Sequence, residues 1–360
     1  MLTHGIRRLQ AMLLGHNVSP EKLYAELEAS SIPVSTADCR TCQDPCDEGH
    51  LSYGRRFDVD METQLLGSIK PYRRQVIIST GKSDWDRDVT DTKGSLAAHI
   101  HTVAHKAAHS SVFHHKAEEE VVPASLPHGI YRPSDSTKIS ILNGNHTTVS
   151  EDHTHETVLI LPDYKVVTGV PSTLHGAEAL YQTALDPSLG RTGIPLEKGT
   201  LKTWVLPYSC LILLCSHKRR DNRCGLSAPK LEQSFIHSLE HHGWMADTKL
   251  EDPSLTMDYP LEEVNGTEED REAYLLKHLK DLPSEKKALI LRNSHIGGHK
   301  YAGNCIIYTP QGASVWYGRI TPHEIESIVV NTIIGGLVLP PLLRGGINLS
   351  RPGCSTLNDW

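Results

Sequence analysis

Two short, uninterrupted apolar runs constrain the fold of this chain more than any other feature of its sequence. They occupy residues 211–214 and 288–291 and contain only Leu, Ile and Ala. Runs of this length are typical of strands buried on both faces, as in the centre of a parallel sheet. A helical pattern with Leu231, Phe235 and Leu239 on one face lies between them, starting near Ser227. This order predicts an α/β fold.

The rest of the C-terminal half extends this prediction. A second helix is expected over residues 268–281, and residues 305–308 and 314–317 should pair as a hairpin. Thr321, Pro322 and Glu324 form a capping box with proline at the first helical position, so a helix should run to about residue 334. Strand, helix, strand, hairpin and helix is a thioredoxin-like order. We therefore expect a thioredoxin-like domain over residues 200–348, followed by a C-terminal tail, 349–360.

The N-terminal half predicts a second α/β domain, over residues 39–190. A strand is expected at 75–79, an Ala/His-rich helix at 96–115, and a hairpin of 158–161 with 165–167. A Pro/Gly-rich connector at about 186–199 marks the expected boundary between the two domains.

Residues 1–38 form a separate N-terminal segment. It contains Arg7 and Arg8 and no acidic residue before Glu21, and Leu2, Ile6, Leu9 and Leu13 share one helical face. An amphipathic, acid-poor start is typical of a mitochondrial presequence, and the alternative is an ordinary surface helix.

Composition excludes several classes of function. A net charge of −7 argues against binding nucleic acid through phosphate neutralisation. The sequence has no run of 18 apolar residues, so no membrane span is expected. Eight cysteines are too few for a disulfide scaffold in 360 residues. Several cysteines should therefore be free thiols or metal ligands.

Four such ligands follow the two buried strands. Cys215 and Cys224 are separated by eight residues, and His295 and His299 lie in Ser-His-Ile-Gly-Gly-His. Functional sites in parallel sheets gather at the carboxyl ends of the strands. The glycine pair allows a tight turn that aims both imidazoles at one point. The loop between the cysteines contains four basic residues (Lys218, Arg219, Arg220 and Arg223), which should favour the thiolate.

Two cysteines and two histidines allow two metal interpretations. Structural zinc usually takes its cysteines two to four residues apart, and the pair here is wider. A [2Fe-2S] cluster spans two irons, so its ligand pairs can come from separate loops, and imidazole ligands raise its potential. The spacing leaves the cluster, zinc and no metal all open.

Four motifs resemble the sucrase/ferredoxin-like family. They are residues 215–225, 295–304, 316–319 and 344–346, and the resemblance covers 205–348 well and the N-terminal half only loosely. Members are fungal and plant thioredoxin-like ferredoxins, and this chain is most similar to their mitochondrial branch. The resemblance implies a [2Fe-2S] cluster bound by Cys215, Cys224, His295 and His299.

The resemblance also implies a function in redox chemistry. We expect electron transfer or thiol-redox quality control in the mitochondrial matrix, with a reductase or thiol proteins as partners and the iron–sulfur assembly machinery as cluster source. The basic loop would suit an acidic reductase. The alternatives are a zinc-stabilised interaction module and a cytoplasmic location, the latter because Leu357-Asn-Asp-Trp360 resembles a docking tail of cytosolic iron–sulfur proteins. No carboxylate pair is placed for glycoside hydrolysis.

A second cysteine cluster lies near the N-terminus. Cys39, Cys42 and Cys46 could bind zinc together with Asp47 or His50, or could form a thiol/disulfide switch. In the latter case the protein would be a thiol oxidoreductase. His101, His105 and His109 share a helical face, which we interpret as solvated polar surface.

Overall fold

The computed structural model describes residues 19–40, 42, 49–54, 57–110, 126–195 and 201–360. Its described strands form one mixed sheet with helices packed on it, which confirms the α/β class. The strand order across the sheet is β2 (Ile130–Tyr131), β12 (Leu343–Ile347), β11 (Ser314–Tyr317), β10 (Cys305–Tyr308), β7 (Cys210–Cys215), β9 (Lys287–Asn293), β3 (Ile139–Gly144), β1 (Arg74–Ser79), β4 (His155–Leu161), β5 (Lys165–Pro171) and β6 (Lys202–Val205), with β8 (Met245–Asp247) also paired to β9.

The centre of the C-terminal half is built on the two apolar runs. β7 and β9 pair in parallel from Cys210↔Ala288 to Cys215↔Asn293, as the sequence predicts. Alternate side chains face opposite ways: Ile212 packs in one core with α5 (Asn222–His241), and Leu213 packs in another with α6 (Glu268–Glu285). Because helices cover both faces, every position of the two runs is apolar.

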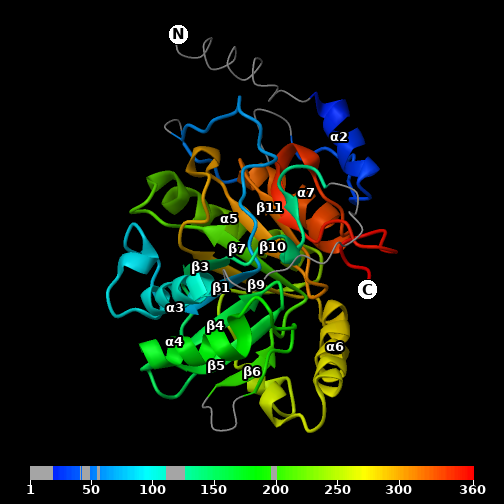
Figure 1. Ribbon diagram of the computed structural model, residues 1–360. Helices are drawn as coiled ribbons and strands as arrows, with labels where there is room; N and C mark the ends of the chain where they lie inside the picture. Colours follow the sequence, from blue (N-terminus) through cyan, green and yellow to red (C-terminus); the bar gives the residue numbers. More distant parts are fainter. Residues whose placement is uncertain (1–18, 41, 43–48, 55–56, 111–125, 196–200) are drawn as a thin grey trace.

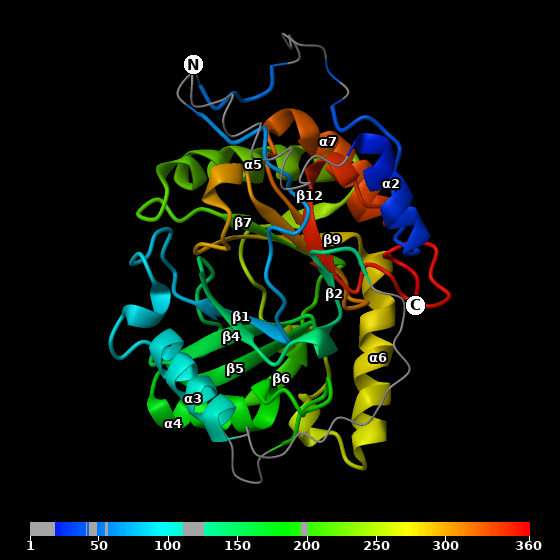
Figure 2. The ribbon, with the colours of Figure 1, turned by 45° about the horizontal axis from the view of Figure 1, so that its top comes forward.

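The sheet has two halves, which meet between β3 and β9. The N-terminal half contains β3, β1, β4, β5 and β6, and the C-terminal half contains the remaining strands. Their ladder contains one register pair, Gly144↔Asn293. Figure 2 shows the halves stacked, with α3 (Leu96–Ser110) and α4 (Leu174–Leu180) covering the outer face of the N-terminal half. The core that includes α6 contains side chains from both halves, among them Leu159 of β4 and Leu289 of β9.

The expected boundary at 186–199 runs between elements of this one sheet. β6 follows the boundary in sequence, yet it pairs with β5, which precedes it. The division into two domains and the thioredoxin-like assignment therefore stay predictions.

Local sequence signals account for several of the element ends. The hairpins β4–β5 and β10–β11 form as predicted. Thr321 and Glu324 make the predicted capping box, which begins η8 (Pro322–Glu324) and continues through α7 (Ile325–Ser327) and η9 (Ile328–Ile334). The expected start of a helix near Ser227 is wrong, because α5 begins at Asn222. The Asp221 side chain caps it by accepting a hydrogen bond from the Arg223 amide.

The N-terminal segment packs on the C-terminal half. In Figures 1 and 2, α2 (Pro20–Ala29) lies beside the C-terminal tail, and Val34 forms a bridge with Val338. The presequence pattern in residues 1–18 falls outside the described residues. Among the helices that the structure describes, none has the length and apolar character needed to cross a membrane.

Candidate metal centre

The parallel pairing of β7 and β9 brings the two predicted ligand pairs to one edge of the sheet. Cys215 ends β7 level with Asn293, two residues before His295. The Cys215 amide donates to the Asn304 carbonyl at 3.2 Å, and the Ser216 amide donates to the Asn293 carbonyl at 3.0 Å. These bonds fix the chain on both sides of the first thiol.

Three of the four predicted ligands lie together. The ligand atoms of Cys215, Cys224 and His295 are all within 4.8 Å of one another. Cys215 Sγ is 3.8 Å from His295 Nδ1, and Cys224 reaches the group from the first turn of α5. Both thiols are buried and the imidazole is half-buried.

His299 lies beside this group but outside it. It begins the short helical turn η7 (His299–Tyr301) and is exposed to solvent. Its ring centroid is 5.8 Å from that of His295. The predicted pair of histidines is therefore adjacent, with one imidazole facing the thiols and the other at the surface.

The glycines between the histidines are needed for their backbone conformation. Gly297 and Gly298 have φ values of 81° and 65°, in the left-handed region that favours glycine. A Cβ at position 298 would collide with the Arg344 guanidinium, whereas one at 297 would meet nothing within 4 Å. The tight turn predicted from the sequence is thus present, and it is closely packed at Gly298 but not at Gly297.

Arg344 supports this turn from β12 and is fully buried. Its guanidinium donates to the Gly297 carbonyl at 3.2 Å, to Asn304 Oδ1 at 2.8 Å and to Ser68 Oγ at 3.0 Å. Burial lowers the pKa of Arg344 to about 10, while the negative charge of Cys215 favours its protonated form. It is therefore a fixed cation next to the thiols.

The two thiols interact through one hydrogen bond. A hydrogen bond from Cys224 is the largest influence that lowers the pKa of Cys215, and the His295 imidazole adds to it against the effect of burial. The same hydrogen bond raises the pKa of Cys224. Of the two thiols, Cys215 therefore loses its proton more readily.

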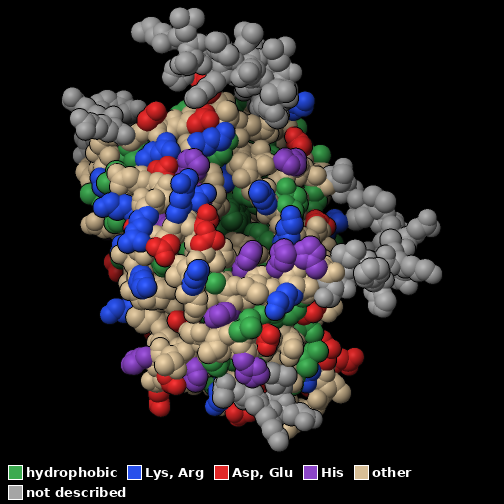
Figure 3. Space-filling view, turned by 60° about the vertical axis from the view of Figure 1, so that its left-hand side comes forward, with side chains coloured by type: hydrophobic (Ala, Val, Ile, Leu, Met, Phe, Trp, Pro, Cys, Tyr) green, Lys and Arg blue, Asp and Glu red, His purple; other side chains and the backbone are tan. Residues whose placement is uncertain are grey.

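The basic loop stabilises the thiolates less, and is a weaker docking surface, than the sequence suggests. Arg219 pairs with Asp86 at 2.9 Å and Arg220 with Asp88 at 3.3 Å. Arg223 favours the Cys224 thiolate, but more weakly than the Cys215 hydrogen bond opposes it. Figure 3 shows a face of the molecule on which Lys and Arg side chains are interspersed with Asp and Glu. Because the loop's arginines already have acidic partners in this chain, it is a weaker docking surface than its sequence implies.

The second predicted cluster is only partly assembled. Cys39 packs against the core of the C-terminal half, and burial raises its pKa to about 11. Cys42 instead lies with His50 and with His323. The sequence had not indicated His323. Cys46 and Asp47 lie outside the described residues.

The predicted histidine face and the C-terminal tail are the remaining features. His101, His105 and His109 are exposed on α3. In the C-terminal tail Leu357 is buried and Arg351 donates to three tail carbonyls, while Trp360 is 45% exposed.

Sequence reasoning placed Arg344 in the 344–346 motif without giving it a role, and it missed His323. An arginine between apolar residues and two glycines in β12 was the available signal for the first. His323 offered no signal, because 281 positions separate it from its neighbour Cys42.

Comparisons with known proteins agree with the motifs. The chain is similar to actin patches distal protein 1 of Saccharomyces cerevisiae, with 26% identity over 85% of this chain and 82% of that protein. It is similar to altered inheritance of mitochondria protein 32 of Debaryomyces hansenii, with 25% identity over 80% of this chain and 88% of that protein. The protein of the same name in Clavispora lusitaniae is 32% identical over 38% of this chain and 34% of its own length. No solved structure matches the chain. The sucrase/ferredoxin-like family matches residues 65–345, and the chain belongs to that family.

Proposed function

We propose that the chain binds a [2Fe-2S] cluster through Cys215, Cys224, His295 and His299 and works as an iron–sulfur redox protein. The observation that carries the proposal is the convergence of two thiols and one imidazole within 4.8 Å, from β7, α5 and the turn after β9. A two-iron cluster needs a wider ligand set than one ion, and His299 stands next to the group. When bound, such a cluster takes up and releases one electron at a time.

The residues around the thiols suit this role. Cys215 and Cys224 are shielded from water, whereas His299 is exposed. Electrons would therefore enter and leave on the histidine side. An imidazole there can also take up a proton, which would couple the redox change to pH. Arg344 adds a buried positive charge that favours the reduced, more negative state.

Partners and compartment follow from the same proposal. A reductase or thiol protein would approach the exposed histidine turn, and the iron–sulfur assembly machinery would supply the cluster. We propose the mitochondrial matrix as its location, supported by the names of the relatives and by the basic, acid-poor first twenty residues. Protease protection in isolated mitochondria, before and after rupture of the inner membrane, tests the location.

Absorption and EPR spectra of the anaerobically purified full chain test the cluster. We expect about two irons and two acid-labile sulfides per chain, with a spectrum that shifts in His295→Cys and in His299→Cys. His153→Cys is the matched control, because that histidine is exposed and remote in sequence from the site.

One observation favours a second candidate, a zinc-stabilised interaction module. The three-residue group is compact enough for a single ion. A colourless protein that contains zinc at Cys215 and Cys224, and no labile sulfide, would select this alternative and refute the cluster.

A further inference from the structure

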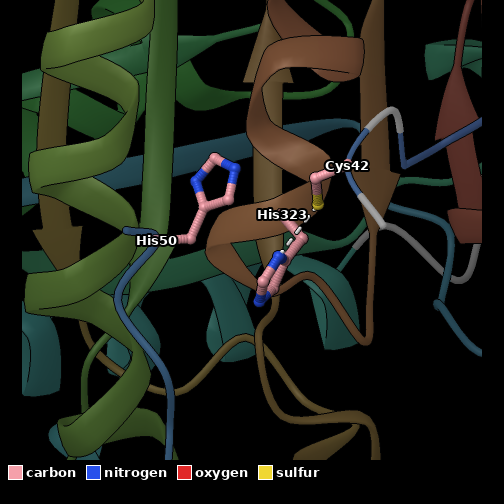
Figure 4. A group of neighbouring side chains, drawn as sticks. All are labelled: Cys42, His50 and His323. Atoms are coloured by element: carbon pink, nitrogen blue, oxygen red, sulfur yellow. Dashed lines mark hydrogen bonds between the residues drawn. The ribbon is translucent and has the colours of Figure 1, made fainter. Parts of the chain in front are cut away.

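We propose that Cys42, His50 and His323 form a second metal centre, which binds zinc and fastens the chain around Cys42 and His50 to the C-terminal half. Figure 4 shows these side chains, with Cys42 and His50 in the stretch that follows the N-terminal segment and His323 on η8. Their ligand atoms all lie within 4.8 Å of one another. Cys42 Sγ is 3.1 Å from His323 Nδ1, and the two imidazole centroids are 4.9 Å apart.

The spacing and the donor types suit zinc. Ligand atoms at zinc–sulfur and zinc–nitrogen distances of about 2.3 and 2.1 Å, in tetrahedral directions, lie roughly 3.5 Å from one another. The ligand atoms of Cys42, His50 and His323, all within 4.8 Å of one another, are close to that spacing. One thiol and two imidazoles are donors that zinc accepts readily, and they are poorly suited to calcium or magnesium, which prefer oxygen.

Separate contacts hold the ligands in place from both sides. On η8, the Thr321 hydroxyl accepts a hydrogen bond from the His323 amide at 3.3 Å. Around Cys42 and His50, Arg40 pairs with Glu324 at 3.0 Å, and the Tyr53 hydroxyl donates to the Ile320 carbonyl at 2.8 Å. These contacts flank the three ligands, so the protein fold itself brings them together.

The position of the centre indicates a structural role. Residues 57–66 follow shortly after His50 in the chain and border the first metal centre. There the Asp60 amide donates to the Lys300 carbonyl at 2.8 Å, and Arg319 donates to the Asp60 and Thr63 carbonyls, both at 2.6 Å. Zinc at Cys42 would therefore clamp the segment that supports the turn after His299.

Metal analysis of the full chain, purified without added metal, tests the proposal. We expect about one zinc per chain in addition to any iron, and loss of that zinc in Cys42→Ser, His50→Ala and His323→Ala. Cys354→Ser should keep the zinc, since that cysteine lies in the C-terminal tail. Cys215→Ser should lose iron and keep zinc, so this centre and the proposed cluster can fail independently.

A measurement on the unmodified chain covers variants that fail to fold. Cobalt added after zinc is removed should give the intense visible bands of tetrahedral coordination together with a thiolate-to-cobalt absorption. The zinc-bound chain should also resist limited proteolysis between residues 35 and 66 at least tenfold longer than the zinc-free chain. Zinc content below a tenth per chain, its persistence in both Cys42→Ser and His323→Ala, or octahedral cobalt spectra would each overturn the proposal.

Discussion

Alanine substitutions at Gly297 and Gly298 should have very different effects on stability, although the two glycines are adjacent. Both have positive φ values, so alanine at either position should cost about 1–2 kcal/mol of backbone strain. At position 297 nothing else is disturbed, because the new Cβ meets nothing within 4 Å.

At position 298 the Cβ would come within 2.6 Å of Arg344 Cζ. The guanidinium cannot move without losing hydrogen bonds to Gly297 and Asn304. Loss of buried hydrogen bonds to a charged group adds roughly 1.5–3 kcal/mol. Gly298→Ala should therefore lower the free energy of unfolding by roughly 2.5–5 kcal/mol in total.

Equilibrium urea unfolding of the reduced, metal-free chain measures the difference. The excess at position 298 should disappear in an Arg344→Met background, because the collision partner is gone. Equal losses at both glycines, or an excess that persists without Arg344, would refute the argument that this side chain fixes the turn.

Two further predictions concern other parts of the chain. Thr321→Ala removes the N-cap of η8 and should cost about 1 kcal/mol in urea unfolding, while Thr321→Ser should cost far less; equal losses would contradict the capping argument. Burial lowers the pKa of His146 from 6.5 to about 4, so the unfolded chain binds a proton in this window that the folded chain does not. Stability should fall as pH drops from 6.5 towards 4, by up to about 3 kcal/mol. His146→Leu should show a correspondingly shallower decline between these pH values, and an unchanged slope would contradict this assignment.

The sequence predicted those parts of the structure that depend on local patterns. The apolar runs of β7 and β9 are typical of buried strands, and the capping box at Thr321 marks a helix start by itself. The convergence of Cys215, Cys224 and His295 followed from placing both ligand pairs after parallel strands. Their role as ligands is still a prediction.

The remaining features depend on contacts that no local pattern encodes. The start of α5 was misplaced because Arg, Cys and Gly in its first turn gave no helical periodicity, and the Asp221 cap was overlooked. Burial of Arg344 runs against the usual exposure of arginine. Pairing of β3 with β9 and the approach of His323 to Cys42 join residues far apart in sequence.

The single register pair between β3 and β9 also affects the proposed ligands. Around it, the Ser294 amide donates to the Asn143 carbonyl, and the Arg292 amide donates to Asn145 Oδ1. Ser294 immediately precedes His295, so the shortest ladder between described strands ends beside an imidazole. A force that separates the two halves of the sheet would act on the β3–β9 ladder first. It would move the His295 imidazole away from the thiols while the longer β7–β9 ladder keeps its hydrogen bonds. Strain between the halves would therefore change the distances between the proposed ligand atoms.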